Sequence, residues 1–540
     1  MPISRRVFTA SVLLAAGAAT AAAAGRAQSA STLSDALRAR DQSAFQHGVA
    51  SGDPLGDRVI LWTRVTPGKA TRPVRVRWRI ASDSALQHIV AQGNTQALPQ
   101  RDFTVKVDAT GLSPGQTYYY QFDADGHASP LGRTRTLPSG VLTRLRLAMV
   151  SCSNLPFGYF NVYANIAARG DLDAVLHLGD YIYEYGPKEW GDGSEFNRAH
   201  LPAHELLTLG DYRQRHAQYK RDPDLQAAHR QHPWITVWDD HETADNAWRD
   251  GARNHNPDKN EGDWRSRKAA GVQAYAEWMP IREVPDADAG LRTWRRFAFG
   301  DLADLLMLDT RLHGRSEQVP KRDAAALANP SRSMLGADQE AWLATELRRS
   351  KQRKAPFRLL GQQVMFGQLL DADRHIVNSD MWDGYPAARQ RIFDLLAAEK
   401  MDGVVVLSGD IHSAWALDLT PTPFAGYDAY TGRSSLAVEM ITTSVTSPSP
   451  YGSGEEAAKR ELSTLQNGPH LKFTNFRQRG YLLLDVTPER AQGEWYFVDS
   501  VSTRGSADVL GAVLAVARGE TRLQRSANAS APNTDRAPAA

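Results

Sequence analysis

The sequence predicts an α/β protein whose core has two stacked β-sheets flanked by helices (an αββα arrangement), preceded by a small all-β sandwich. Three observations lead to this fold class. Segments of alternating polar and apolar residues occupy the chain from about residue 45 to 138, and short apolar runs alternate with helix-like stretches from residue 145 onwards. The length of 540 residues also exceeds that of a typical small domain, which favours two domains.

The all-β module, predicted over residues 45–138, depends on period-two segments separated by turns that contain Pro and Gly. These segments are 58–65, 74–80, 103–107 and 117–122. Such spacing is typical of an antiparallel sandwich. The turn at 111–115, just before the tyrosine-rich segment, gives it a fibronectin-like appearance, which concerns the fold and not the function.

The second domain is predicted over residues 145–510. Its helices are expected at 337–350 and 388–399, where apolar residues recur at helical spacing. Its strands are expected at the short apolar runs 145–150, 174–178, 234–238, 304–308, 404–407, 436–441, 481–486 and 494–498. The polar and aromatic region 188–268 is expected to form loops and helices that cover the site.

Both ends of the chain are predicted to lie outside the fold. Arg5 and Arg6 precede Phe8 and an Ala-rich apolar stretch, which predicts a twin-arginine signal peptide over residues 1–27. The stretch is too short and too rich in alanine to favour a membrane anchor. We therefore expect a protein exported by the twin-arginine machinery to the periplasm or the medium. Residues 28–44 are expected to be a linker and 525–540 a disordered tail.

Composition excludes some classes of partner. With 63 Lys and Arg against 61 Asp and Glu, the net charge is +2, so no large basic field exists to bind nucleic acid. The single cysteine, Cys152, excludes an intramolecular disulfide, although exported proteins often contain them. We expect a small-molecule substrate and a fold that is stabilised by packing and metals.

Three acidic motifs each follow an apolar run. They are Gly179-Asp180-Tyr181-Ile182-Tyr183, Asp239-Asp240-His241-Glu242 and Gly409-Asp410-Ile411-His412. Carboxylates and imidazoles that converge from several strand ends are typical of a two-metal hydrolase, because each metal needs several ligands at fixed separation. Asp180 is suited to bridge two metals. A phenolate from Tyr183 would favour a hard ferric ion.

The remaining residues of the motifs allow more than one role. Asp410 and His412 are two apart, so both can face a metal. In the middle motif, we assign Asp240 to the second metal and His241 to the phosphate or the leaving group, while Asp239 is either an additional ligand or a buried acid paired with an arginine. Cys152 follows a strand too, and its position fits a metal ligand and a small buried residue equally well.

These motifs resemble those of the calcineurin-like metallophosphoesterase superfamily and, more closely, the alkaline phosphatase D (PhoD) family. Further resemblance is found at Phe45 to Pro54, Ser151 to Asn154, Trp238 to Glu242 and Leu308 to Arg311. The resemblance covers about residues 45–500. It implies a ferric ion (Fe3+) that is held by Cys152, Asp180, Tyr183 and His412, with Asp180 as the bridge.

The resemblance also implies a second metal at Asp240 and Asp410. Purple acid phosphatases have Asn and His at these two positions, so carboxylates here favour calcium (Ca2+) over zinc. A further calcium near Asp239 is consistent with PhoD-type enzymes. The superfamily's intervening VxxH histidine has no counterpart, and Gln362 and Gln363 stand where it is expected.

The function implied is that of an exported, metal-dependent alkaline phosphatase. It would hydrolyse phosphate monoesters, and also diesters, by attack of a metal-bound hydroxide and release inorganic phosphate. The alternative is a phosphodiesterase of phospholipase D type acting on phospholipids or other diesters, because the family includes such enzymes. A non-catalytic metal-binding surface protein is disfavoured, since a passive binder has little use for a two-metal ligand set.

Overall fold

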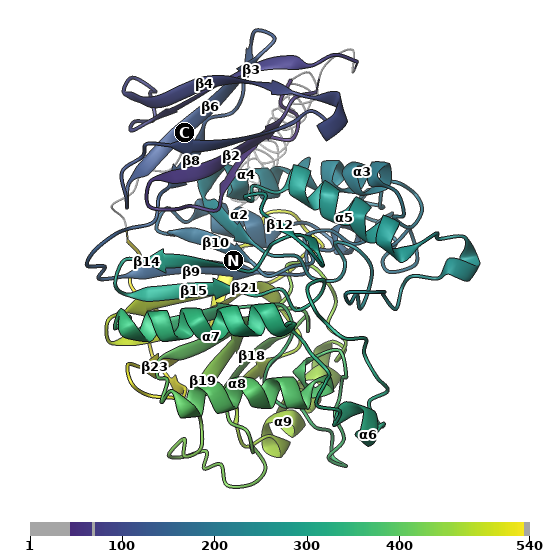
Figure 1. Ribbon diagram of the computed structural model, residues 1–540, viewed down its shortest axis with the longest axis vertical. Helices are drawn as coiled ribbons and strands as arrows, with labels where there is room; N and C mark the ends of the chain where they lie inside the picture. The colour runs from purple at the N-terminus through teal and green to yellow at the C-terminus, as the bar shows by residue number, and fades with distance from the viewer. Residues whose placement is uncertain (1–43, 67–70, 534–540) are drawn as a thin grey trace, which may run out of the picture.

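The computed structural model describes residues 44–66 and 71–533 and shows a core of two stacked β-sheets with helices on both outer faces (Figure 1). The first sheet has ten strands in the order β24-β23-β22-β21-β9-β10-β11-β1-β2-β5. The second has seven, in the order β14-β15-β16-β17-β19-β18-β20. The predicted fold class is therefore confirmed.

The first sheet combines both ends of the described chain. Its strands are β1 (Val49–Gly52), β2 (Arg58–Arg64), β5 (Thr104–Thr110), β9 (Leu145–Val150), β10 (Ala174–His177), β11 (Pro233–Thr236), β21 (Arg479–Thr487), β22 (Arg490–Val498), β23 (Asp508–Ala517) and β24 (Gln524–Arg525). The central strands β9, β10, β11 and β1 run parallel to one another.

The second sheet lies entirely in the later part of the chain. Its strands are β14 (Arg295–Phe299), β15 (Ala303–Met307), β16 (Phe357–Gly361), β17 (Val404–Ser408), β18 (Ala414–Leu419), β19 (Ala437–Ile441) and β20 (Leu471–Asn475). Strands β15, β16, β17 and β19 are parallel and fully buried, as near-continuous apolar runs predict. A separate short hairpin is made of β12 (Pro285–Asp286) and β13 (Gly290–Leu291).

The helices divide between the two outer faces. They are α2 (Asn161–Ala168), α3 (Leu209–Lys220), α4 (Pro223–Gln231), α5 (Trp264–Trp278), α6 (Ala324–Leu327), α7 (Ala337–Gln352), α8 (Pro386–Ala398) and α9 (Gly454–Asn467). Their starts follow local chemistry: Asp222 and Asp263 cap the N-termini of α4 and α5 with their carboxylates, and Thr208 forms a capping box with Asp211 at α3.

Three apolar clusters hold the layers together. One fills the space between the two sheets, with Met149, Leu176, Leu407 and Met440 among its members. A second packs the outer face of the first sheet against α2 to α5, and a third packs the second sheet against α7, α8 and α9. Figure 1 shows α7 and α8 across the outer face of the second sheet.

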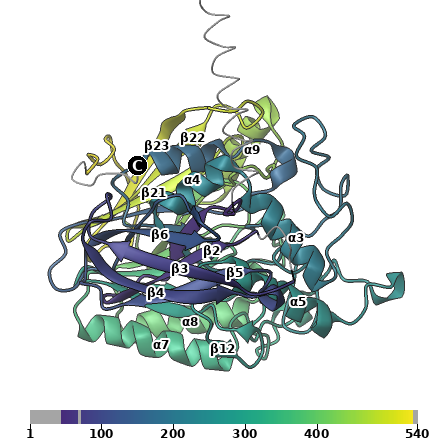
Figure 2. The same ribbon diagram turned by 90° about the horizontal axis from the view of Figure 1, so that it is seen from above.

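The N-terminal region is all-β, as predicted, but one of its two layers is shared with the core. Strands β3 (Val74–Ala81), β4 (Ile89–Ala97), β6 (Thr117–Ala124), β7 (His127–Ala128) and β8 (Gly132–Arg135) form a five-stranded sheet. This sheet lies at the top of the molecule in Figure 1, faces the viewer in Figure 2 and packs, through one apolar cluster, against β2 and β5. Strand β1 then pairs with β11, so the sandwich continues directly into the first core sheet.

The prediction of a disordered tail is wrong for residues 525–533. Strand β24 pairs with β23, and the Ser530 amide donates to Glu494 at 2.6 Å. The Ala531 carbonyl accepts a hydrogen bond from buried Arg146 at 2.6 Å. The tail has few apolar residues, but its backbone provides partners for charged side chains that face this edge of the sheet. Residues 534–540 lie outside the described residues, as do the predicted signal peptide and most of the predicted linker.

Within residues 44–66 and 71–533, no helix combines the length and apolar character required to cross a membrane.

Candidate metal centre

The predicted site residues come together at the C-terminal ends of parallel strands from both sheets. Cys152 follows β9, Asp180 follows β10, Asp240 follows β11, and Asp410 and His412 follow β17. They face a cavity of about 520 Å³, apart from Cys152, which is fully buried behind it. The other walls of the cavity are formed by Trp190, His241, Asp245, Asn246, Arg253, Asp380, Tyr451 and Arg460.

Four of these residues have an unusual backbone. Cys152, Asp180, Asp410 and His412 have φ values of 61°, 56°, 62° and 54°, which place them in the left-handed region. Non-glycine residues seldom adopt this conformation, and such strain concentrates at functional sites. Gly179 has φ of 105°, and a Cβ there would lie 2.3 Å from the Asp239 Cβ, so the turn before Asp180 requires glycine.

The first group of donors contains Cys152, Asp180, Tyr183 and His412. One ligand atom from each of Cys152, Asp180 and His412 lies within 4.8 Å of the others. The Tyr183 hydroxyl donates to Asp180 Oδ2 at 3.0 Å and lies 3.3 Å from His412 Nε2. A sulfur, a phenol, an imidazole and a carboxylate therefore converge on one small volume, which we call the sulfur–phenol group.

The segment 446–448 supports the sulfur–phenol group from behind. His412 Nδ1 lies 3.0 Å from the Pro448 carbonyl, which can only accept, so Nδ1 donates and Nε2 of the neutral ring keeps its lone pair for a metal. Ser447 Oγ lies 2.7 Å from the Tyr183 hydroxyl and donates to the Cys152 carbonyl at 3.0 Å. One short segment thus fixes three of the four donors.

Burial controls the protonation of the same group. It lowers the pKa of His412 to about 3, with a further contribution from the charge of His241. Burial and the neighbouring Asp180 carboxylate raise the pKa of both Cys152 and Tyr183 well above their usual ranges. A cation bound here would have to displace the thiol and phenol protons, as metals do when they bind such ligands.

The second group of donors is made of carboxylates, and we call it the carboxylate group. Asp239, Asp240 and Asp410 place one oxygen each within 4.8 Å of the others. Asp180 and Asp240, together with His241, satisfy the same criterion, so Asp180 belongs to both groups. This arrangement is what the proposed bridging role requires.

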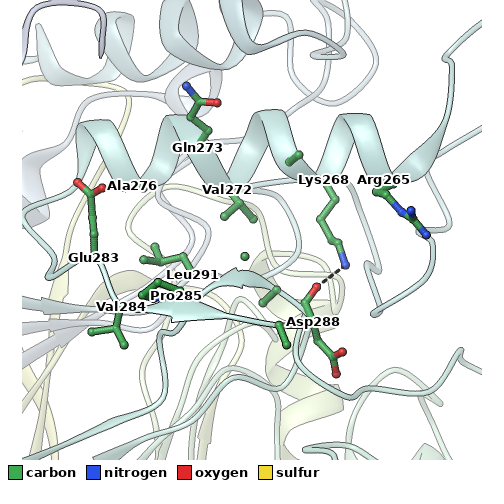
Figure 3. A pocket seen from close by; sticks show the side chains of 14 residues that line it. Arg265, Lys268, Val272, Gln273, Ala276, Glu283, Val284, Pro285, Asp288 and Leu291 are labelled. Atoms are coloured by element: carbon green, nitrogen blue, oxygen red, sulfur yellow. Dashed lines mark hydrogen bonds between the residues drawn. The ribbon is translucent and has the colours of Figure 1, made fainter. Parts of the chain in front are cut away.

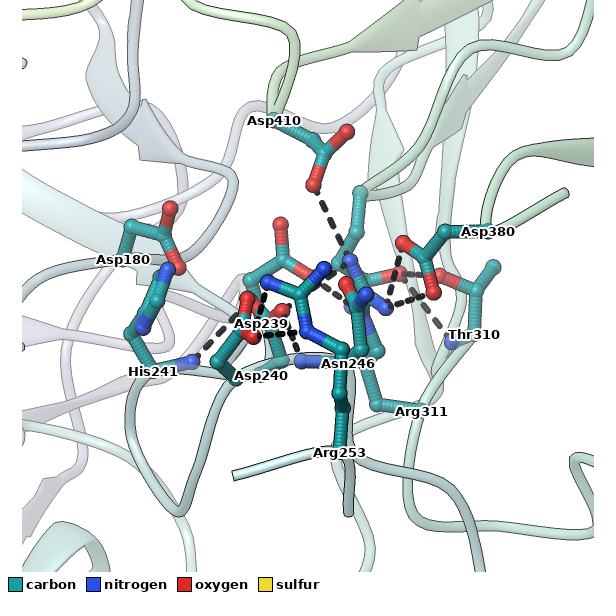
Figure 4. A network of polar contacts seen from close by, with 12 residues as sticks. Asp180, Asp239, Asp240, His241, Asn246, Arg253, Thr310, Arg311, Asp380 and Asp410 are labelled. Carbon is teal, nitrogen blue, oxygen red and sulfur yellow. Dashed lines mark hydrogen bonds and ion pairs between the residues drawn. The ribbon is translucent and has the colours of Figure 1, made fainter. Parts of the chain in front are cut away.

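Arg311 is the centre of the carboxylate group (Figure 4). Its side chain is fully buried; Nε donates to Asp239, Nη1 to both oxygens of Asp380 at 2.9 and 2.8 Å, and Nη2 to Asp410 at 3.0 Å. One guanidinium therefore joins carboxylates from three separate segments. Asp239 is thus paired with an arginine, one of the two alternatives that its sequence position allows.

Two carboxylate oxygens keep unused acceptor capacity. Asp180 Oδ1 and Asp239 Oδ2 are both buried and have no hydrogen-bond partner among the described residues. A buried, unpaired carboxylate oxygen is costly, and metal coordination is one of the few ways to satisfy it. The orphaned oxygens and the clustered donors fit bound cations, with hard oxygen ligands in the carboxylate group and sulfur and nitrogen in the sulfur–phenol group.

His241 faces the cavity between the two donor groups. Its Nδ1 lies 2.7 Å from Glu184 Oε2. Burial alone would lower the pKa of His241, but the carboxylates of Asp240, Glu184 and Asp180 outweigh this effect and raise the pKa well above its usual range. The raised pKa favours a protonated ring, held by Glu184, that can donate a proton or bind an anionic oxygen.

Glu242 joins the two loops that carry Asp180 and Asp239. Its carboxylate accepts hydrogen bonds from the backbone amides of Asp180 at 3.1 Å, Tyr181 at 2.6 Å and Asp239 at 2.8 Å. The last residue of the middle motif is therefore a brace and not a ligand.

Several contributors were missed by sequence reasoning. Asp380 lies in a loop with no strand before it, so no pattern marks it. The sequence marks Arg311 only through the resemblance of Leu308 to Arg311 to a family signature. Gln363, at the position expected for the absent histidine, instead bonds the Trp238 carbonyl at 2.7 Å and the Thr310 amide at 3.0 Å, and so braces the strand ends. Gln362 bonds Ser408 and Trp382 in the same way.

The cavity next to α5 lacks this chemistry. A hollow of about 420 Å³ between α5 and the β12–β13 hairpin is lined mainly by apolar side chains such as Val272, Val284 and Leu291 (Figure 3). Its rim carries Lys268, which donates to the Asp288 carbonyl at 2.8 Å. Among the described residues, the other acidic group, Asp371, Asp373 and His375, is exposed in a loop, where such clusters are common without a metal.

Comparisons with known proteins point to one family. Residues 147–495 match the model of the PhoD-like phosphatase family, and residues 28–138 match the model of its N-terminal domain. Alkaline phosphatase D from Bacillus subtilis (strain 168) is 36% identical over 501 residues, which are 89% of this chain and 82% of that protein. A solved structure of PhoD superimposes with a TM-score of 0.81 at 34% identity, covering 91% of this chain and 93% of the other.

Proposed function

The chain belongs to the PhoD-like phosphatase family and is a phosphoric ester hydrolase, and on this basis we propose that it is a metal-dependent alkaline phosphatase that releases inorganic phosphate from monoesters. The observation that carries the proposal is the convergence of two donor groups on Asp180, one of mixed sulfur, phenol and imidazole donors and one of carboxylates.

The sulfur–phenol group would hold a ferric ion. Cys152, Tyr183 and His412 complete this group with Asp180, and a phenolate donor favours a hard trivalent ion. The carboxylate group would hold calcium through Asp180, Asp240 and Asp410, since calcium prefers several oxygen ligands. Asp239 supports a further calcium through its orphaned Oδ2, although Arg311 already occupies its other oxygen.

When bound, the two cations would offset the charge of the phosphoryl oxygens and activate water for in-line attack. The chain's own residues would orient the phosphate ester and protonate its leaving group. The His241 imidazolium, held by Glu184, is placed to donate a proton to the leaving ester oxygen or to bind a phosphoryl oxygen. Arg253 and Asn246, which line the cavity next to Asp240, provide donors for the remaining oxygens.

The cavity supports a second substrate class. A volume of about 520 Å³ is greater than a single phosphate fills, so a second ester group can be accommodated. Hydrolysis of diesters, including the phospholipase D type of reaction on phospholipids, is therefore the alternative proposal for the same site.

The test combines metal analysis with turnover. We expect iron and calcium by mass spectrometry, a phenolate-to-iron absorption band that is lost in Tyr183→Phe, and chelator-sensitive hydrolysis of chromogenic monoesters. Ser447→Ala is a matched control, because it removes a hydroxyl partner of Tyr183 but leaves the phenol. A colourless protein that contains only zinc would exclude the ferric assignment. Faster hydrolysis of a chromogenic diester than of the monoester would favour the alternative.

We also propose export by the twin-arginine machinery to the periplasm or the medium, from the Arg5-Arg6 pair and the apolar stretch that follows. Replacing both arginines by lysine should leave the full-length chain in the cytoplasm. Unchanged export of that variant would contradict the proposal.

A further inference from the structure

A second polar cavity lies directly behind the sulfur–phenol group. It has a volume of about 320 Å³ and is lined by the start of β21, the loop after β22 and the segment 446–448. The two cavities share no lining residue. Thr446 and Pro448 line the second cavity, while this same segment bonds His412, Tyr183 and Cys152 on its other side.

Arg479 gives the second cavity its charge. Its Nη1 is buried and has no hydrogen-bond partner among the described residues, while the side chain as a whole is half-buried. Other arginines buried near the site are paired: Arg311 and Arg315 both contact Asp380. Burial also lowers the pKa of Arg479 to about 10, and the nearby Cys152 opposes this effect only in part. An unpaired guanidinium is costly, which points to an anion that is not part of the chain.

The surrounding groups suit an oxyanion. Arg477, which also lines the cavity, shares its charge with Glu461 at 3.2 Å. Gln478 and the hydroxyl of Ser502 add donors, and the one acidic lining residue, Asp499, is exposed. The planar fork of an arginine matches a tetrahedral oxyanion, because it can donate two parallel hydrogen bonds.

We propose that this cavity is a second binding site for a tetrahedral oxyanion, with inorganic phosphate as its occupant. The choice of phosphate rests on the proposed function, which makes phosphate the product at high local concentration. The site is separate from the catalytic cavity but touches the segment that fixes three of the four sulfur–phenol donors. Its occupation should therefore slow turnover even when substrate is saturating.

The direct test counts bound phosphate in the metal-loaded enzyme by equilibrium dialysis. The native chain should bind two phosphates, and Arg479→Gln should bind one. Arg433→Gln is the matched control, since Arg433 is exposed and lines neither cavity. If Arg479→Gln does not fold, Ser502→Asp places a negative charge on the wall and should remove the same phosphate. Sulfate should compete, whereas acetate should not.

The outcomes separate this inference from the proposed function. One phosphate in the native chain that is retained in Arg479→Gln would overturn the second site and leave the catalytic one. One phosphate that is lost in Arg479→Gln would support the second site while contradicting the proposed active site. In kinetics, the part of phosphate inhibition that saturating substrate does not relieve should disappear in Arg479→Gln, and its persistence would overturn the proposal.

Discussion

The two donor groups of the metal centre differ in how the charges of their donors are balanced. In the sulfur–phenol group, Cys152, Tyr183 and His412 can each be neutral, and apart from the shared Asp180 carboxylate their partners are uncharged: two serine hydroxyls and a backbone carbonyl. In the carboxylate group, the donors are acids, and a buried arginine balances them. Without a cation, the first group therefore carries the charge of Asp180 alone, whereas the second holds several carboxylates that depend on Arg311.

This difference predicts which property, metal binding or stability, a substitution in each group should affect. Loss of a donor from the sulfur–phenol group should remove metal binding and leave the fold intact. Loss of Arg311 should place several carboxylates together without compensation and destabilise the protein itself. Asp180 belongs to both groups and should show the largest functional effect.

Asp180→Asn should decrease hydrolysis by on the order of 10³-fold, because an amide is a poor bridge between two cations, each of which contributes several kcal/mol of transition-state stabilisation. The measurement is kcat/KM on a chromogenic monoester together with metal content. The unfolding midpoint should change little. Full activity in this variant would show that the two groups do not share Asp180.

Arg311→Met should decrease the free energy of unfolding by about 3 to 5 kcal/mol, since it leaves buried carboxylates without their partner. Urea denaturation of the metal-free protein measures the effect, and added calcium should recover part of it. Arg296→Met is the control: its partner Asp304 keeps a second arginine, Arg353, so a loss of only about 1 kcal/mol is expected. Equal losses of unfolding free energy in both variants would contradict the idea that the carboxylate group depends on Arg311.

Arg253→Gln tests the wall of the metal-centre cavity outside both donor groups. The Arg253 side chain is 68% exposed, pairs with Asp245 and lines the cavity. Removing one charged donor to a substrate oxygen should raise KM about tenfold and leave kcat nearly unchanged. A fall in kcat at constant KM would instead place Arg253 in the chemical step.

His216→Phe extends the comparison to a neutral site behind the centre. His216 stacks on Trp278, both of its ring nitrogens lack partners, and burial together with the charges of Lys220 and Arg215 lowers its pKa to about 3. The unfolded chain takes up this proton below about pH 6.5 but the folded chain does not, so stability is lost as pH falls from 6.5 towards 3. Phenylalanine should reduce that loss by roughly 1 kcal/mol per pH unit, measured by urea unfolding at pH 4 to 7. The exposed His127→Phe should not change it.

Site residues that lie at strand ends could be predicted from the sequence, whereas those that loops bring to the site could not. Cys152, Asp180, Asp410 and His412 follow apolar runs, so their convergence was predictable from parallel strands. Asp380 could not be found in this way, because a loop brings it to Arg311 and a loop leaves no periodic signal. The attachment of residues 525–533 was missed for a similar reason: backbone groups form the contacts there, and composition does not report them.

The boundary of the sandwich shows a further limit. Strand β1 is only four residues long, and its pairing with β11 joins positions about 180 residues apart in the chain. Periodicity predicts that a strand exists but not which partner it pairs with. The N-terminal module was therefore predicted as a unit of its own, while its strands extend the core sheet.

The first sheet places strands from distant parts of the chain next to each other, and this order also determines when the protein can fold. Strand β9 lies between β10 and β21, and β21 begins more than 300 residues later in the sequence. A ribosome that adds about 5 to 20 residues per second needs on the order of half a minute to produce the missing neighbour. During that time, the edge of β9 exposes unpaired backbone groups to other chains. Newly made molecules are therefore most vulnerable to aggregation before synthesis ends, and a chaperone that shields this edge would raise the yield of active enzyme.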